Sequence, residues 1–177
     1  MTADPLRRTA FARHAGRLAA VAAREVVFAS QVSARVEDAG ARELGLPAEP
    51  NTWVALGERE AMWLGPDEWL VCSEIEPPPD VVRDLELRAG HHHRSVVDVS
   101  ANRAVLELTG ADRLDVLAAG CGLDLHPRWW RSGACAQTLL ANAAVLLQER
   151  QASTRVFVRP SFAGHVVAWL ERVASDR

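Results

Sequence analysis

The stretch SVVDVSANRAVLELTGADRLDVLAAG, residues 95–120, combines two strand-like runs with one helical run. The runs SVVDVS and RAVLELTG are short and rich in valine and leucine, which predicts two strands. In ADRLDVLAAG, Leu114 and Leu117 fall on one side of a helix, and Gly120 is placed to end it. Two strands followed by a helix indicate mixed α and β structure.

The same changes of period recur on both sides of this stretch. Alternating apolar residues predict strands, and apolar residues three or four apart predict helices. Gly45 is expected to close a short helix, and Asp80 and Ser161 are expected to cap two later ones. Pro77–Pro79 is expected to form a stiff spacer. Strands are expected over residues 24–36, 52–56, 61–65, 68–75, 134–141, 144–149 and 154–159, and helices over residues 37–45, 81–89 and 161–173.

These elements run β-α-β-β-β-α-β and then β-α-β-β-β-α, so two sets of similar order follow each other. Helices are too few, and strands too often adjacent, for a doubly wound parallel sheet. We therefore expect an α+β fold of two small α/β-sandwich-like halves, residues 24–100 and residues 101–177. A basic N-terminal helix, residues 1–23, is expected to precede them.

The composition excludes several classes of enzyme. The 177 residues include neither lysine nor tyrosine, so all 20 positive side chains are arginine. Without lysine there is no Schiff-base chemistry, no pyridoxal phosphate anchor and no phosphate-binding lysine of a Walker loop. The net charge is −3, and the arginines are scattered among 23 acidic residues, which argues against a nucleic-acid-binding protein.

Membrane and export signals are not recognised either. No run approaches the roughly 18 consecutive apolar residues of a membrane span, so we expect a cytoplasmic location. Cys72, Cys121 and Cys135 are an odd number outside any CxxC pair, which indicates reduced thiols. The basic segment of residues 5–24 has three interpretations: a solvated helix, a docking arm for an acidic partner, or a transit peptide.

No motif predicts a catalytic, cofactor-binding or metal-binding residue on this chain. The triplet His91–His93 could ligate a metal, but no companion pair of Cys or His is near it, so a solvated linker is expected. His126 is a possible general base in a loop, and His165 is expected at the surface or packed edge of the last helix.

The glycine-rich segment and the acid pairs fit structural roles better than phosphate binding or catalysis. Gly120-Cys121-Gly122 follows a helix, whereas a phosphate cradle must lead into one, so we expect a helix end there. The pairs Asp112/Asp115 and Glu58/Glu60 are expected on surface segments. Neither pair has a setting that would move a carboxyl pKa toward neutrality.

Tryptophan is the most distinctive side chain, with six copies beside only four phenylalanines. Trp129 and Trp130 lie in a polar loop between Arg128 and Arg131, and this composition is typical of an interface hot spot. Two interpretations remain open at this point. Either these four residues contact a partner, or one ring folds inward and the other covers it.

Several stretches resemble the gamma subunit family of heterotetrameric sarcosine oxidase, and together they span roughly residues 24–173. WLGPDEWL, and GCGLDLHP followed by AQTLL, are the most specific because both spacing and order match. The paired tryptophans and the histidine triplet depart from the family pattern. The matching stretches are LGLPAEPNT (44–52), WLGPDEWLV (63–71), VVDVSANRAVLELTGADRLDVLAAGCGLDLHP (96–127), CAQTLLANAAVLLQ (135–148) and VRPSFAGHVVAWLE (158–171).

This resemblance implies a non-catalytic accessory subunit. The whole enzyme demethylates sarcosine oxidatively to glycine and hydrogen peroxide, and forms methylenetetrahydrofolate when tetrahydrofolate is the acceptor. The resemblance implies that FAD, FMN, NAD and tetrahydrofolate belong to partner subunits and that this chain carries no cofactor. It would pack on the folate-type portion of the large alpha subunit, with beta and delta subunits in the same assembly.

A weaker resemblance links the stretch from DVS to TLL with the aminomethyltransferase of glycine cleavage, a folate-binding fold. That family is expected to follow TLL with a glycine turn and a catalytic aspartate, whereas this sequence continues LLANAAVLLQER. The resemblance therefore supports the fold and counts against the activity. The alternative function is a free-standing folate-binding or aminomethyltransferase-like protein.

Overall fold

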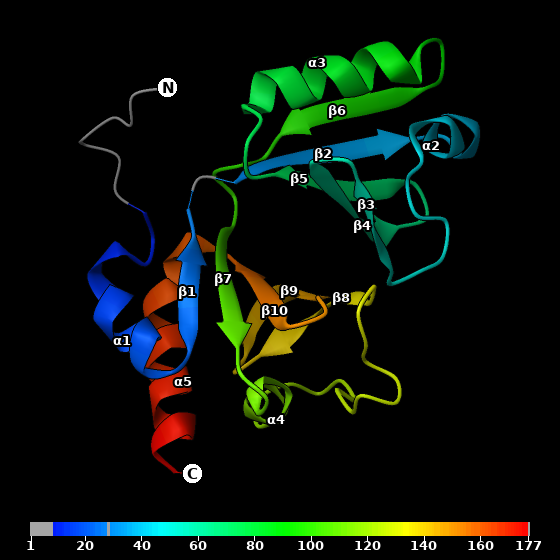
Figure 1. Ribbon diagram of the computed structural model, residues 1–177. Helices are drawn as coiled ribbons and strands as arrows, with labels where there is room; N and C mark the ends of the chain where they lie inside the picture. Colours follow the sequence, from blue (N-terminus) through cyan, green and yellow to red (C-terminus); the bar gives the residue numbers. More distant parts are fainter. Residues whose placement is uncertain (1–8, 28, 177) are drawn as a thin grey trace.

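The computed structural model describes residues 9–27 and 29–176, and its strands form two antiparallel sheets (Figure 1). The first sheet has the strand order β3-β4-β5-β2-β6. Its strands are β2 (Ser30–Val36), β3 (Trp53–Leu56), β4 (Arg59–Gly65), β5 (Glu68–Ser73) and β6 (Arg94–Asp98). The second sheet has the order β1-β7-β10-β9-β8. Its strands are β1 (Ala23–Val26), β7 (Ala104–Thr109), β8 (Cys135–Leu140), β9 (Ala143–Glu149) and β10 (Ser153–Val158).

Helices cover the outer face of each sheet, which gives four layers in the order helix, sheet, sheet, helix (Figure 1). On the first sheet these are α2 (Asp38–Leu44) and α3 (Pro78–Ala89). On the second sheet they are α1 (Ala15–Ala20), α4 (Arg113–Ala118) and α5 (Ala163–Ser175), with short 3₁₀ turns at Ala12–His14 and Pro160–Phe162. This is the expected α+β class.

The central strands are buried on both faces because each sheet lies between helices and the other sheet. In β10 all six residues are buried. Val156 and Val158 pack toward the helices, whereas Phe157 packs toward the first sheet among residues such as Met62 and Leu146. Since side chains alternate along a strand, Arg155 lies on the same inner face as Phe157.

The strand predicted over residues 24–36 is in fact two strands in different sheets. β1 pairs with β7 of the second sheet, whereas β2 pairs with β5 and β6 of the first sheet. The apolar alternation in the sequence continues through residues 24–36. The pattern therefore does not reveal that the chain passes from one sheet to the other within this run.

The predicted N-terminal helix is also shorter than expected. From Thr9 onward it consists of a 3₁₀ turn and the six residues of α1, and residues 1–8 lie outside the described residues. Arg17 of α1 forms an ion pair with Glu171 of α5. The described part of this segment therefore packs on the helical layer of the second sheet.

Of the three expected helix ends, one is confirmed and two are not. Gly45 ends α2 in the left-handed conformation, as predicted, with φ of 75°. Neither Asp80 nor Ser161 caps a helix through its side chain, and Asp80 instead pairs with Arg83 one turn later. The proline triplet is not a separate spacer, because α3 begins at Pro78, where the first turn needs no backbone N–H.

Gly120 is required by packing, since a β-carbon at this position would lie 2.6 Å from the Trp169 ring. Trp169 belongs to α5 and is 7% exposed, so its ring has little room to move. We expect Gly120→Ala to lower the free energy of unfolding by about 1–3 kcal/mol in urea denaturation. Gly122→Ala is the control, because nothing lies within 4 Å of its added β-carbon. Equal stability of the two variants would contradict this account.

Candidate functional site

Six charged side chains meet between the two sheets, and we call them the inter-sheet ion cluster. Residues two positions apart on a strand face the same side of the sheet. The central members of the cluster each lie two positions from an apolar residue of the inter-sheet core, so they face the other sheet. Glu60 is two residues from Met62, and Glu107 is two residues from Val105. The members are Glu60, Glu74, Arg24, Arg150, Glu107 and Arg155.

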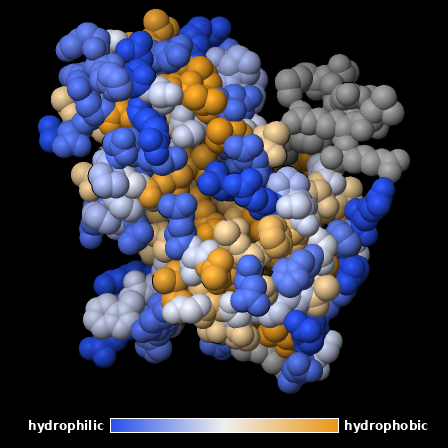
Figure 2. Space-filling view, turned by 180° about the vertical axis from the view of Figure 1, so that it is seen from behind, coloured by the Kyte–Doolittle hydropathy of each residue, from blue (hydrophilic) through white to orange (hydrophobic). Residues whose placement is uncertain are grey.

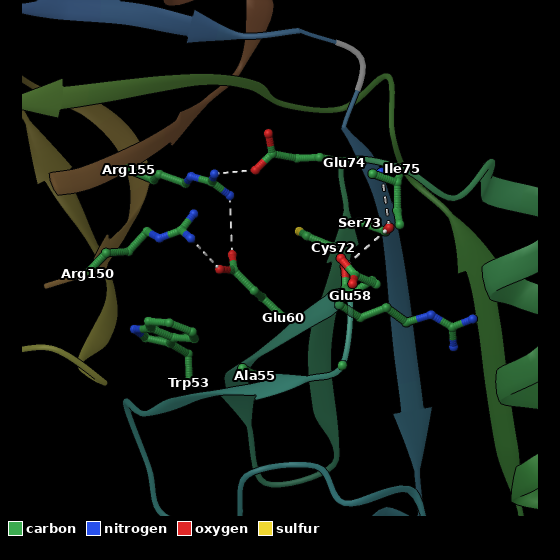
Figure 3. Close-up of a pocket in the computed structure, with 12 residues that line it drawn as sticks. Trp53, Ala55, Glu58, Glu60, Cys72, Ser73, Glu74, Ile75, Arg150 and Arg155 are labelled. Atoms are coloured by element: carbon green, nitrogen blue, oxygen red, sulfur yellow. Dashed lines mark hydrogen bonds and ion pairs between the residues drawn. The ribbon is translucent and has the colours of Figure 1, made fainter. Parts of the chain in front are cut away.

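Arg155 is the centre of the cluster, with a side chain only 5% exposed. Its Nη1 lies 3.2 Å from Glu60 Oε2, and its Nε lies 3.3 Å from Glu107 Oε1. Its Nη2 also donates to Glu74, which follows β5. Glu107 belongs to the second sheet, whereas Glu60 and Glu74 belong to the first sheet or its end, so one guanidinium joins the two sheets (Figure 3).

Further hydrogen bonds hold the carboxylates in place. Arg150 Nη2 lies 3.0 Å from Glu60 Oε1. The amide Nε2 of Gln148, a fully buried residue, donates to Glu60 Oε2 at 3.0 Å. Ser153 donates to Glu107 Oε1 at 3.1 Å, and Arg24 pairs with Glu107 from β1. The cluster thus contains three arginines and three glutamates, and its formal charge is zero.

The electrostatics favour the ionised forms of Glu107 and Arg155. Burial by itself would raise the pKa of Glu107, but the attraction of Arg155 and Arg24 outweighs it, and the pKa lies below its ordinary value. Burial opposes the charge of Arg155 in the same way, yet its pKa is raised because it donates to Glu74 and lies close to Glu60. Both shifts favour the charged forms of Glu107 and Arg155, which suits ion pairing better than proton transfer.

A cavity of about 470 Å³ adjoins the cluster. Trp53, Cys72, Glu58 and Ile75 contribute to its walls, and Arg150 and Arg155 reach across it toward Glu60 and Glu74 (Figure 3). Burial raises the pKa of the Cys72 thiol, so this sulfur is a poor nucleophile. The cavity is therefore lined by paired charges and a protonated thiol.

The prediction that Glu58 and Glu60 both lie on a surface segment is wrong for Glu60, whose side chain is 16% exposed. A signal for the cluster was present in the sequence, because single charged residues interrupt apolar strands in VLEL and TRVFV. The sequence did not reveal that Glu107 and Arg155 lie opposite each other on neighbouring strands, or that Glu60 and Glu74 of the other half complete the cluster. Asp112 and Asp115 of the second acid pair are both exposed.

The tryptophan loop, residues 119–134, connects α4 to β8 and projects from the body of the molecule (Figures 1 and 2). Its two tryptophans differ. Trp130 is 7% exposed and donates from Nε1 to Glu149 Oε2 at 3.1 Å, whereas Trp129 is 64% exposed. The Arg128 guanidinium carbon lies 5.5 Å from the centre of the Trp129 ring. Trp130 therefore anchors the loop, and Trp129 is displayed rather than covering its neighbour.

A second loop supports this display. Trp53 N donates to Gly133 O, and Cys135 N donates to Asn51 O, both at 2.8 Å. A hollow of about 600 Å³ lies between the two loops, and both Trp129 and Arg131 line it. Among the described residues, Arg128 and Arg131 form no ion pair. The loop thus presents an aromatic ring beside two free positive charges.

The histidine triplet is not simply a solvated linker. His91 and His93 are exposed, but the His92 side chain is 8% exposed and packs against Gly40 of α2. His92 Nδ1 lies 2.6 Å from Glu37 Oε1, and its Nε2 lies 3.2 Å from Glu43 Oε1. His92 therefore joins α2 to the segment after α3.

The other candidate residues occupy structural positions. His126 Nδ1 accepts a hydrogen bond from Arg128 N, and His165 on exposed α5 surface contacts Ala141 O at 2.7 Å. Gly120 accommodates Trp169, and no group of three or more His, Cys, Asp or Glu residues within the described ranges could hold a metal ion. In the same ranges no helix has the length and apolar character needed to cross a bilayer.

Comparison with known proteins identifies close relatives. The model of the sarcosine oxidase gamma subunit family matches residues 23–176. Sarcosine oxidase subunit gamma of Corynebacterium sp. (strain U-96) is 36% identical over 173 residues, covering 89% of this chain and 80% of the relative. The Arthrobacter sp. subunit is 37% identical over 161 residues, covering 85% and 78%.

Solved structures agree with these sequence matches. A chain of the heterotetrameric sarcosine oxidase from Corynebacterium sp. U-96, in complex with pyrrole 2-carboxylate, matches with a TM-score of 0.86 and 34% identity. The match covers 97% of this chain and 96% of that chain. Glycine cleavage system aminomethyltransferase T from Bartonella henselae matches with a TM-score of 0.63 at 13% identity, covering 88% of this chain and 48% of that one. The second match confirms the expected aminomethyltransferase-type fold.

We expect Arg155→Met to lower the free energy of unfolding by about 3–5 kcal/mol, because two buried carboxylates lose their shared cation. Since the pKa of Glu107 is depressed in the folded state, its contribution is complete at neutral pH and disappears as the pH falls through that pKa. The deficit should therefore shrink in acid, as measured by urea denaturation at several pH values.

The matched control for this variant is Arg35→Met, which breaks an exposed pair with Glu68. Its cost should stay below about 1 kcal/mol. Similar costs for the two arginine variants would contradict the role given to the cluster.

His92 should contribute stability in the opposite pH range. Its hydrogen bond to Glu37, and then its contact with Glu43, raise the pKa of His92 above its ordinary value. The stabilisation is therefore complete below the unfolded pKa of about 6.5 and is lost as the pH rises through the raised folded pKa. Thermal unfolding of His92→Gln should show a larger loss of stability at acidic than at alkaline pH. The exposed control His93→Gln should show no loss of stability at either pH. A loss in His92→Gln that does not change with pH would refute the ion-pair role.

Proposed function

The chain belongs to the sarcosine oxidase gamma subunit family, and from this premise we propose that it is the accessory gamma subunit of a heterotetrameric sarcosine oxidase. The observation that carries the proposal is the match to one chain of such a heterotetramer over nearly the full length of both chains. A free-standing folate-binding or aminomethyltransferase-like protein is disfavoured by the same match.

In this proposal the chain is non-catalytic and its role is structural. The interior between the sheets is occupied by arginines and glutamates that neutralise one another, and burial raises the pKa of the Cys72 thiol beside them. These groups hold the halves together, and FAD, FMN, NAD and tetrahydrofolate are assigned to the partner subunits. The substrate would be demethylated on those subunits, in the cytoplasm.

The partner proposed for direct contact is the folate-type portion of the alpha subunit, with beta and delta subunits elsewhere in the assembly. The face shown in Figure 2 supports a packing role, because apolar side chains gather in its middle and polar ones surround them. A rigid chain with such a surface can buttress a larger subunit without contributing to its chemistry.

The tryptophan loop is the contact we propose within this interface. Of the four residues considered from the sequence, Trp130 is buried, so the contact surface consists of Arg128, Trp129 and Arg131. An exposed ring beside unpaired guanidinium groups fits an apolar pocket rimmed by carboxylates. The alpha subunit is therefore expected to present acidic residues around an apolar recess.

Co-expression with the alpha, beta and delta subunits tests the proposed function. Purification through a tag on alpha should retain this chain in equimolar amount, together with flavin absorbance and sarcosine-dependent hydrogen peroxide formation. The isolated chain should form no peroxide with sarcosine and added flavin. If the chain remains a monodisperse monomer and does not bind those subunits, the proposal is wrong.

In the same experiment, Trp129→Ala should reduce the retained chain by about tenfold or more, the loss typical of an interface hot spot. The folded state should be unaffected, because the ring is largely exposed. Leu87→Ala, which truncates a 74% exposed apolar side chain on α3, is the control and should be retained normally. Equal retention of both variants would remove the tryptophan loop from the interface.

A further inference from the structure

The strand β6 lies at the edge of the first sheet and has one open side (Figure 1). Among the described strands it pairs with β2 alone, and each of its residues except Val96 is exposed. Its register with β2 runs without a shift from Arg94 to Asp98, so the edge is regular. A regular, exposed strand edge is a template for pairing with another strand.

Two other sheet edges are partly occupied by loops of the chain itself. Trp53 N of β3 donates to Gly133 O. Cys135 N of β8 donates to Asn51 O. These two edges therefore close on each other's loops, and β6 differs from them because no loop in the described part of the chain bonds to its open side.

The backbone groups on this open side belong to Arg94, Val96 and Asp98. Val99 N donates to Gln31 O at 2.8 Å, so Val99 bonds toward β2. In an antiparallel pair, successive residues direct their N–H and C=O groups alternately toward one neighbour and away from it. Every second residue, counted back from Asp98, therefore directs both groups away from β2 and has them available for another strand.

The charges of this edge are complementary to a second copy of the same edge. If two β6 strands pair antiparallel about Val96, Arg94 of each copy lies opposite Asp98 of the other. This register also brings the three residues with available backbone groups into hydrogen-bonded pairs. The strand thus matches a second copy in both backbone and charge.

Both charged side chains are available for such pairs. They are exposed, and neither forms an ion pair within the described ranges. Asp98 accepts from Ser100 through Oδ1 alone, and Arg94 uses Nη1 alone to contact carbonyl oxygens. Charged residues on an edge normally keep other strands away. Here their opposite signs at the two ends favour a strand with the same charges in reverse order.

The helical layer fits the same arrangement, because α3 packs on both β2 and β6. Neighbouring strands lie about 4.8 Å apart, so the α3 helices of two paired copies would lie about 10 Å apart, close to the usual distance of packed helices. On the other face of β6, Val97 is 51% exposed and would lie beside Ser95 of the second copy. Pairing would therefore add side-chain contacts on both faces of the strand.

We propose that β6 is a self-association edge whose partner is a second copy of this chain, paired antiparallel about Val96. The inference goes beyond the proposed gamma-subunit role, because it concerns two copies of this chain and not the contact with alpha. The contacts are few, so the association is weak and depends on concentration.

Sedimentation equilibrium of the isolated full-length chain tests the proposal. The mass should rise from 19.3 kDa toward twice that value as the concentration approaches about 100 µM, since a small interface associates weakly. Arg94→Asp should weaken the association by about tenfold or more, because aspartates then oppose each other at both ends. Arg172→Asp, which reverses an exposed charge on α5, is the control and should associate as the parent does. A monomer at every concentration would overturn the proposal, as would equal association of the two variants.

A mixture of two variants separates edge pairing from any loss of folding. Asp98→Arg alone should also weaken association, because arginines then oppose each other at both ends. An equimolar mixture of Arg94→Asp and Asp98→Arg should form a mixed dimer, since each arginine of one variant faces an aspartate of the other. Circular dichroism checks that both variants are folded. Folded variants that do not associate when mixed would refute the proposed register.

The same variants reveal whether a different subunit occupies this edge. If the isolated chain stays monomeric and Arg94→Asp lowers its retention by tagged alpha, the occupant is a partner subunit and the proposal is wrong. Sedimentation of the isolated chain involves no other subunit. Failure of the proposed gamma-subunit role would therefore leave that measurement unchanged, and the two results can be told apart.

Discussion

The buried guanidinium of Arg155 constrains the whole structure, because an unpaired charge at this depth would oppose folding. Its partners must come from both sheets at once. This fixes the register of β4, β7 and β10, since a shift of one residue would turn Glu60 or Glu107 to the helical side. The apolar residues of the inter-sheet core allow many ways of stacking two sheets. The ion cluster selects one of them.

The end of β9 contacts both the ion cluster and the tryptophan loop. Gln148 and Glu149 are neighbours on β9, so their side chains face opposite sides of the sheet. Gln148 holds Glu60 on the inner side, while Glu149 accepts from Trp130 at 3.1 Å and pairs with Arg113 on the helical side. The position of the exposed Trp129 thus depends on a strand whose register is set by the ion cluster. Interior electrostatics and the proposed contact surface are coupled through two adjacent residues.

The sequence predicted the local elements well because their apolar periods are strong and their ends carry glycine or proline. It failed where the answer depended on partners far apart in the chain. The run over residues 24–36 keeps one alternation through two sheets, so nothing local marks the crossing. Glu60 resembles a surface residue until Arg155 is brought against it, and His92 resembles its exposed neighbours until α2 packs on it. The sequence left open which ring of the tryptophan pair turns inward, and the hydrogen bond of Trp130 to Glu149 decides it.

Charged side chains between the two sheets differ from those of the tryptophan loop in their ion pairing. Between the sheets, every glutamate of the ion cluster has an arginine within ion-pair distance, and the pKa of Glu107 is lowered accordingly. The lowered pKa keeps Glu107 in the charged form that ion pairing requires. At the tryptophan loop, by contrast, Arg128 and Arg131 form no ion pair with any described residue. The charges between the sheets therefore serve the fold, whereas those of the tryptophan loop are the ones that the proposed interface would use.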